Sequence, residues 1–108
     1  MKKYRVEVTR SGFCDLEQIS DFYLSEGDQK LASALILKIE KAIDQLKTMP
    51  ERGSEASTLV RETGRRYQQF LAEPFRLIYR VEGDWVFILM ILHQRQNAQK
   101  ALRNRLLK

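Results

Sequence analysis

The chain has 108 residues and a mass of 12.7 kDa, which is the size of one domain rather than two. A hydrophobic fraction of 44% and a charged fraction of 31% exclude a disordered tail and a membrane-embedded chain. The net charge of +5 favours an acidic partner, either nucleic acid or an acidic protein segment. We therefore expect a single domain over residues 1–108.

The basic excess is confined to the second half of the chain. Residues 1–56 carry a net charge of −1, whereas residues 57–108 carry +6. Eight of the ten cations in the second half are arginine. Because a guanidinium group makes planar, bidentate contacts with phosphate or carboxylate, we expect the second half to carry the binding surface.

The single cysteine, Cys14, excludes an intramolecular disulfide and a cysteine-built zinc site. We expect it to be a buried small apolar residue in a reducing cytoplasm. The longest apolar run, residues 85–92, is too short to span a bilayer, and the charged N-terminus does not resemble a signal peptide. With one histidine and no glycine-rich phosphate loop, the sequence indicates no metal and no cofactor.

Three elements are predicted in the first half of the chain. Alternating apolar and polar residues predict a strand over 4–8. Helical spacing predicts a helix over about 13–24, with Asp15 in its first turn, where the helix dipole favours an acid. A long apolar stripe predicts a second helix over 29–48, with Asp28 as its N-cap. The short turn between the helices predicts an antiparallel helical hairpin.

The second half is predicted to be mostly strand. Residues 51–64 are polar without a clear period and are expected to form a loop. Two hairpins follow, with strands over 65–71, 75–82 and 85–93, and then a helix over about 98–107 capped by Asn97. The order β–α–α–β–β–β–α predicts an α+β fold in which one antiparallel sheet packs on the helical hairpin.

The register of the second hairpin decides which side chains share a face of the sheet. A two-residue loop at Gly83-Asp84 pairs Arg76 with Ile91. The expected packed face holds Phe75, Leu77, Tyr79, Val81, Val86, Ile88, Met90 and Leu92. The expected basic and aromatic face holds Arg76, Ile78, Arg80, Glu82, Trp85, Phe87, Leu89, Ile91 and His93.

In this register Arg76 and His93 are diagonal neighbours, within reach of a common ligand. A three-residue loop over 72–74 adds Arg66 and Phe70 to the same face, and a loop of another length reverses that assignment. Arginines at positions 76 and 80, in the middle of a strand, favour either a function or a specific ion pair.

The last helix is expected to cover part of the basic face. Its apolar stripe is Ala98, Ala101, Leu102 and Leu106. The cations in and before it are Arg95, Lys100, Arg103, Arg105 and Lys108. These charges form either an anion-attracting surface or the solvated side of a lid helix.

An ordered set of short segments runs along nearly the whole chain. The segments are Tyr4-Arg5-Val6, Asp15-Leu16-Glu17-Gln18-Ile19, Pro50-Glu51-Arg52-Gly53-Ser54, Gly64-Arg65-Arg66, Phe75-Arg76-Leu77-Ile78-Tyr79-Arg80-Val81 and Ile91-Leu92-His93-Gln94-Arg95-Gln96-Asn97. With the predicted β–α–α–β–β–β–α order, they resemble the RelE/ParE superfamily of bacterial toxins, nearer the ParE branch.

The resemblance implies a cytoplasmic toxin of a type II toxin–antitoxin system, held in a hetero-oligomer by an antitoxin that wraps an acidic segment around it. It implies inhibition of DNA gyrase and of growth, with contact to DNA only through gyrase or the antitoxin, and neither a membrane nor a cofactor. The expected antitoxin contacts are a sheet edge or an apolar groove beside the hairpin, near Leu37. The residues expected to bind the target are Arg76, Arg80, His93, Arg95, Arg103 and Arg105.

Two other functions stay open. RelE-type relatives cut messenger RNA in the ribosome, and such a nuclease needs a general base, a general acid and cations on the phosphate. Here His93 is the candidate acid or base, with Arg76 and Arg66 on the phosphate, but Gln94 cannot transfer a proton and no second acid–base group is evident. The other possibility is a binding module without toxic activity. For His93 alone, the favoured interpretation is an imidazole at the end of a strand that hydrogen-bonds locally.

Overall fold

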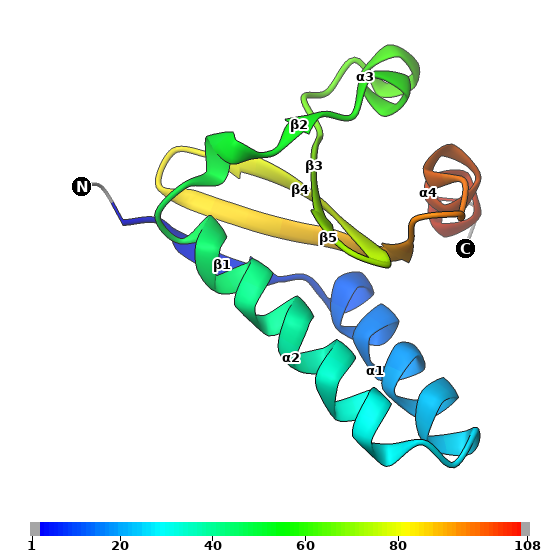
Figure 1. Cartoon of the computed structure of the whole chain (residues 1–108). Coiled ribbons are helices and arrows are strands. Elements are labelled where there is room, and N and C mark those ends of the chain that lie inside the picture. The colour runs from blue at the N-terminus through cyan, green and yellow to red at the C-terminus, as the bar shows by residue number, and fades with distance from the viewer. Residues whose placement is uncertain (1–2, 107–108) are drawn as a thin grey trace.

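A computed structural model describes residues 3–106, apart from the side chains of Thr58, Glu62 and Leu106. The elements are β1 (Arg5–Val8), α1 (Arg10–Ser25), α2 (Gln29–Leu46), the 3₁₀-helix η1 (Pro50–Arg52), β2 (Ser54–Glu55), α3 (Ser57–Thr63), β3 (Gln68–Ala72), β4 (Phe75–Glu82), β5 (Trp85–His93) and α4 (Ala98–Leu106). One sheet of strand order β1-β5-β4-β3-β2 has α1 and α2 on one face, and α3 and α4 toward the other (Figure 1). The predicted α+β class and element order are confirmed.

The two helices of the hairpin begin at side-chain caps. Thr9 accepts the backbone N–H of Gly12 at 3.3 Å, so α1 begins at Arg10, earlier than predicted. Asp15 therefore lies in the second turn, and its expected first-turn position was wrong. The predicted cap of α2 is confirmed, because Asp28 Oδ1 accepts the N–H of Leu31 at 2.9 Å.

The main core lies between α2 and the sheet. Ile39 and Leu46 of the α2 stripe are 0% exposed, and Leu77 and Ile88 on the facing strands are equally buried. Full burial of one such side chain stabilises the fold by roughly 1.5–3 kcal/mol. The apolar stripe that predicted α2 is therefore the stripe that holds the hairpin on the sheet.

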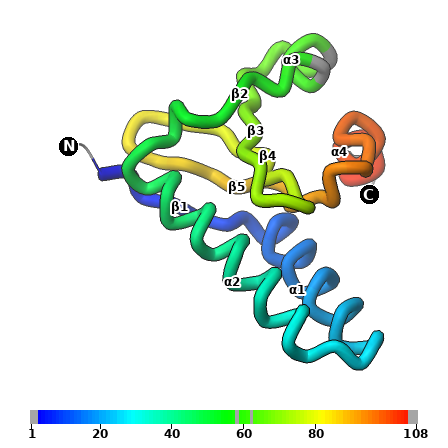
Figure 2. The backbone as a smooth tube through the Cα atoms, in the orientation of Figure 1, coloured from blue at the N-terminus to red at the C-terminus, as the bar shows by residue number. Residues whose placement is uncertain are grey.

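The first strand lies next to the last one (Figure 2). β1 pairs with β5 in parallel, so the sheet is mixed, whereas an antiparallel sheet was expected. The start of α1 passes close to β5 at Gly12, where an added Cβ would lie 2.8 Å from the carbonyl oxygen of Ile88. A glycine is needed there because the helix approaches the strand backbone so closely.

Residues 51–64 are not a plain loop. They form most of η1, then β2 and α3, and the last of these buries Leu59 completely. Leu59 belongs to a second core with Ala56, Tyr67, Ile78, Met90, Leu92 and Ala98, on the face opposite the hairpin. The segment has no period in the sequence because only a few of its side chains reach this core.

An extra residue in β5 changes which side chains share a face. Ile78 pairs with Met90 but Tyr79 pairs with Ile88, which leaves Leu89 as a β-bulge. Beyond the bulge the faces are reversed, because one added residue turns each following side chain to the other side. Ile91 and His93 therefore lie on the hairpin face, and Met90 and Leu92 lie in the second core, opposite to the prediction.

Two predictions about the basic face are wrong for the same kind of reason. Arg76 pairs with Leu92, and His93 pairs with Phe75, so the Arg76 and His93 side chains leave the sheet on opposite faces and are not the expected diagonal neighbours. The β3–β4 loop has two residues, not three, and Phe70 consequently lies opposite Leu77 on the hairpin face.

Candidate functional site

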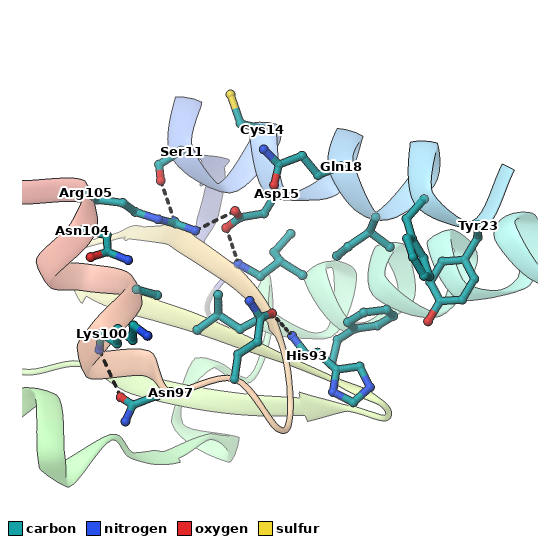
Figure 3. Close-up of a pocket in the computed structure, with 17 residues that line it drawn as sticks. Ser11, Cys14, Asp15, Gln18, Tyr23, His93, Asn97, Lys100, Asn104 and Arg105 are labelled. Atoms are coloured by element: carbon teal, nitrogen blue, oxygen red, sulfur yellow. Dashed lines mark hydrogen bonds and ion pairs between the residues drawn. The ribbon is translucent and has the colours of Figure 1, made fainter. Parts of the chain in front are cut away.

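A groove of about 900 Å³ lies between α1, the end of β5 and α4 (Figure 3). Its apolar part is formed by Ile19, Phe22, Phe75 and Ile91. Gln18, His93, Asn97, Lys100 and Asn104 supply polar groups around it. A groove with apolar walls and a polar border is suited to a segment of a protein partner.

One end of the groove is closed by an ion pair between α1 and α4. Asp15 Oδ1 lies 2.6 Å from Arg105 Nη2, and the two side chains point toward one another in Figure 3. The Asp15 side chain is 12% exposed and that of Arg105 is 28% exposed. Arg105 Nη1 also donates to Ser11 Oγ at 2.6 Å. This cluster holds α4 against α1.

The same cluster satisfies backbone groups at the β-bulge. Asp15 Oδ2 accepts the N–H of Ile91 at 2.9 Å, and Arg105 Nη1 lies 3.3 Å from the carbonyl oxygen of Leu89. A bulge leaves backbone donors and acceptors without ladder partners, and buried groups of this kind need other partners. Asp15 and Arg105 therefore stabilise both the position of α4 and the irregular register of β5.

Arg76 has internal partners as well. Its Nη1 donates to Gln69 Oε1 at 3.1 Å and its Nη2 donates to the carbonyl oxygen of Gln96 at 2.6 Å. These bonds tie β4 and β3 to the turn between β5 and α4. The sequence favoured either a function or a specific ion pair for Arg76, and among the described residues its partners are two amide oxygens rather than a carboxylate.

His93 lies at the other end of the groove from the ion pair. Its Nδ1 accepts the N–H of Arg95 at 3.2 Å, and its ring lies edge-on to Phe75 with centroids 5.9 Å apart. Its backbone N–H donates to Gln96 Oε1 at 2.8 Å. The imidazole is therefore locally hydrogen-bonded, as one interpretation of the sequence had it, with a single ring nitrogen left for a ligand.

The predicted site residues are not brought together. Arg76 lies across the sheet from His93, and Arg66 lies in the segment between α3 and β3, beside a separate hollow with Arg65 and Arg80. Arg95 and Arg103 are exposed, in the turn before α4 and on α4 itself. Lys108 lies outside the described residues. The three residues of the alternative nuclease, His93, Arg76 and Arg66, therefore do not form one constellation.

Several groove residues were not assigned to a site from the sequence. Ser11, Asp15 and Phe22 lie on one side of α1, and their spacing of four and seven residues is the signal that could have grouped them. The expectation for Cys14 was wrong, because Cys14 is exposed. It lies two residues, about 200° of helical rotation, from both Gly12 and Leu16, which face the core.

Between residues 3 and 106, no helix is both long and apolar enough to cross a membrane. In the same part of the chain, no three His, Cys, Asp or Glu side chains are placed to hold a metal ion together.

Comparison with known proteins places the chain in a family. Toxin ParE3 of Caulobacter vibrioides is 33% identical over 93 residues, which cover 86% of this chain and 89% of that protein. The structure described as the chromosomal ParDE TA system from P. aeruginosa superposes with a TM-score of 0.69 at 24% identity, over 84% of this chain and 96% of that one. The family profile described as "ParE toxin of type II toxin-antitoxin system, parDE" matches residues 6–98. The chain therefore belongs to the ParE toxin family of type II toxin–antitoxin systems.

Proposed function

We propose that this toxin acts in the cytoplasm, inhibits DNA gyrase and so arrests growth, and is neutralised by a cognate antitoxin that lies in the groove between α1 and α4. The observation that carries the proposal is the match to the ParE toxin family over residues 6–98. The open groove supports the antitoxin part of the proposal, because it offers an apolar surface that the described part of the chain leaves uncovered.

The charges around the groove favour an acidic occupant. Arg105 is neutralised by Asp15, whereas the side chain of Lys100 is exposed at the border and has no ion pair among the described residues. A helix or extended segment with apolar residues toward the sheet and a carboxylate near Lys100 would complement this surface. An acidic segment of an antitoxin has this character.

Inhibition of gyrase requires a surface that binds the enzyme, and it requires no group of acid and base side chains. The separation of His93, Arg76 and Arg66 supports this function over cleavage of messenger RNA, because RNA cleavage needs its catalytic groups around one phosphate. Arg95 and Arg103 remain candidate target contacts, since both are exposed near α4.

Purified toxin and gyrase test the target directly. We expect the toxin to inhibit DNA supercoiling and to leave messenger RNA uncut in a translation reaction. Cleavage of messenger RNA without any inhibition of gyrase would overturn the gyrase proposal in favour of a ribosome-dependent nuclease. Unimpaired growth on induction without antitoxin would overturn both, and would indicate a binding module without toxic activity.

Two phenylalanines of α1 give a matched test of the antitoxin groove. Phe22 lines the groove and is 56% exposed, whereas Phe13 is 53% exposed and lies nine residues earlier, about half a turn out of phase. We expect Phe22→Asp to weaken binding of the cognate antitoxin at least tenfold, and Phe13→Asp to change it little. Equal effects of both substitutions would contradict the groove assignment.

A further inference from the structure

A second hollow, of about 450 Å³, lies on the part of the molecule where β4 ends. It is lined by Arg65, Arg66, Arg80, Val81 and Glu82. Arg65 and Arg66 come from the segment between α3 and β3, and the other residues come from β4. None of these five residues lines the groove between α1 and α4, so the two surfaces are distinct.

The guanidinium groups around this hollow are largely unpartnered. Arg65 and Arg66 are exposed, and within residues 3–106 neither side chain has a hydrogen bond or an ion pair. Arg80 Nε lies 3.0 Å from Glu82 Oε1, and no described residue accepts a hydrogen bond from the terminal amino groups of Arg80. Three cations thus surround the hollow with one carboxylate. By contrast, Arg76 and Arg105 use their amino groups on internal acceptors.

A row of stacked side chains continues from the hollow along the sheet. The guanidinium carbon of Arg80 lies 5.8 Å from the centroid of the Phe87 ring, and Phe87 stacks on Trp85 at 5.8 Å with an interplanar angle of 9°. The guanidinium carbon of Arg5 lies 5.5 Å from the centroid of the Trp85 ring at the far end. The row lies on the face opposite the helical hairpin, since Val86 and Ile88, which alternate with these aromatic residues, belong to the hairpin core.

We infer that the hollow and the stacked row form a binding site for a nucleic-acid strand, with Arg65, Arg66 and Arg80 on the phosphates. Guanidinium groups bind phosphate bidentately, and the guanidinium groups of Arg80 and Arg5 at the two ends of the row can stack on a base. Cations beside aromatic side chains on an open sheet face are the combination used to hold single strands. An acidic peptide would gain from the arginines but not from the stacked row, which favours nucleic acid.

The expected affinity of this site is low. Three phosphate contacts make a small electrostatic contribution to the binding free energy, and this contribution falls steeply as the salt concentration rises. The toxin alone should therefore bind DNA weakly at physiological salt, and the site would act chiefly on a strand that another protein presents. In the cell that protein would be gyrase, and this step alone rests on the proposed function.

The only tryptophan of the chain, Trp85, reports on the site directly. The first experiment titrates the wild-type toxin with a short single-stranded DNA oligonucleotide at low salt and follows Trp85 fluorescence. We expect saturable quenching and an affinity that falls steeply with added salt. A short poly-glutamate peptide is the parallel probe, and we expect it to bind at least tenfold more weakly.

A matched pair of double variants separates the site from net charge. Arg65→Ala/Arg66→Ala removes two cations at the hollow, and Lys38→Ala/Lys41→Ala removes two exposed cations from α2. We expect the arginine variant to weaken oligonucleotide binding at least tenfold and to reduce the log–log salt slope by about one per arginine. We expect the lysine variant to change the affinity by less than about threefold, the effect of a distant charge.

Three results would overturn the inference: absence of any Trp85 response to the oligonucleotide, equal losses in the two double variants, or poly-glutamate binding as tight as that of DNA. The last result would reassign the hollow to an acidic peptide. Oligonucleotide binding is measured without gyrase, so a failure of gyrase inhibition leaves this result standing. Gyrase inhibition without oligonucleotide binding would overturn the nucleic-acid site and leave the proposed function intact.

Discussion

Two groups of arginines in the second half of this toxin differ in their partners. On the side of α4, Arg76 and Arg105 donate to amide, hydroxyl, carboxylate and backbone acceptors. At the end of β4, Arg65 and Arg66 have no such partners in the described chain. The first group holds α4 and the end of the sheet together, whereas the second is available to a ligand.

This difference changes the meaning of the net charge of +5. An arginine paired with Asp15 contributes little field outside the protein, because the two charges lie 2.6 Å apart. The surface that attracts an acidic partner is therefore set by the few unpaired cations rather than by the total. Substitutions in the two groups should accordingly separate stability from binding.

The largest effect on stability is expected at Asp15. Asp15→Ala leaves Arg105 without its carboxylate and the N–H of Ile91 without an acceptor. Loss of one partner from a largely buried pair costs several kcal/mol, and the partial exposure of Arg105 reduces this to about 2–3 kcal/mol. Urea denaturation followed by far-UV circular dichroism measures the loss.

An exposed ion pair supplies the control for Asp15. Asp44 lies 3.2 Å from Lys47 at the end of α2, and both side chains are exposed. Asp44→Ala should cost less than about 0.5 kcal/mol. Equal losses in Asp15→Ala and Asp44→Ala would show that the cluster at the bulge does not hold α4.

The next effect is expected at Tyr79, which is adjacent to Arg80 on β4 but faces the hairpin core. Its hydroxyl donates to the carbonyl oxygen of Pro50 and accepts the N–H of Gly53. Tyr79→Phe should cost about 1–2 kcal/mol, because two buried backbone groups lose their partner. Gly53→Ala should be at least as damaging, since an added Cβ would collide with the Tyr79 hydroxyl and lie 2.7 Å from the carbonyl oxygen of Gln69.

Tyr79 also predicts a dependence of stability on alkaline pH. Burial raises its pKa above the ordinary value, an effect that the hydrogen bond from Gly53 opposes and the charge of Glu51 reinforces. The folded protein therefore holds the phenolic proton more tightly than the unfolded chain. The resulting stability is fully present below about pH 10 and is lost as the pH rises through the raised pKa.

Urea midpoints measured at about pH 8 and about pH 11 test this dependence. The wild type should lose more stability between the two values than Tyr79→Phe, which lacks the group. A loss of the same size in both proteins would assign the alkaline effect to other residues.

A smaller effect is expected at Arg76. Arg76→Lys keeps the charge but cannot reach both Gln69 and the carbonyl oxygen of Gln96, so one of the two hydrogen bonds is lost. We expect a cost of about 1 kcal/mol and faster amide exchange in the turn between β5 and α4. Hydrogen exchange measured by mass spectrometry locates the change, and faster exchange in α2 instead would contradict the assignment.

Periodic patterns allowed most of the fold to be predicted from the sequence. The α2 stripe, the Asp28 cap and the Gly83-Asp84 hairpin depend on residues close together in the chain, and the structure confirms each. The bulge at Leu89 depends on Asp15 and Arg105, which are 90 residues apart in sequence. No local signal reports such a contact, so the reversed faces of residues 90–93 could not be predicted.

The candidate site was harder to predict for a related reason. Whether an arginine is free or bound depends on its acceptors, and those of Arg76 lie in Gln69 and in the turn after β5. The sequence indicated arginines in unusual mid-strand positions, and it indicated the half of the chain that carries them. It could not assign them to separate surfaces, because that assignment depends on the register of two hairpins.

The smallest effect on stability, with the largest contrast to Asp15, is expected for Arg65→Ala/Arg66→Ala. Both side chains are exposed and without partners in the described chain, so the free energy of unfolding should change by less than about 0.5 kcal/mol. In a supercoiling assay at fixed toxin concentration, the variant should nevertheless inhibit gyrase less than the wild type, because a strand held by gyrase would lose two phosphate contacts. Lys38→Ala/Lys41→Ala, with the same net charge, should inhibit as the wild type does. If Arg65→Ala/Arg66→Ala destabilises the fold instead, Arg65 and Arg66 have a structural role like that of Arg76 and Arg105. The distinction between the two groups of arginines would then be lost.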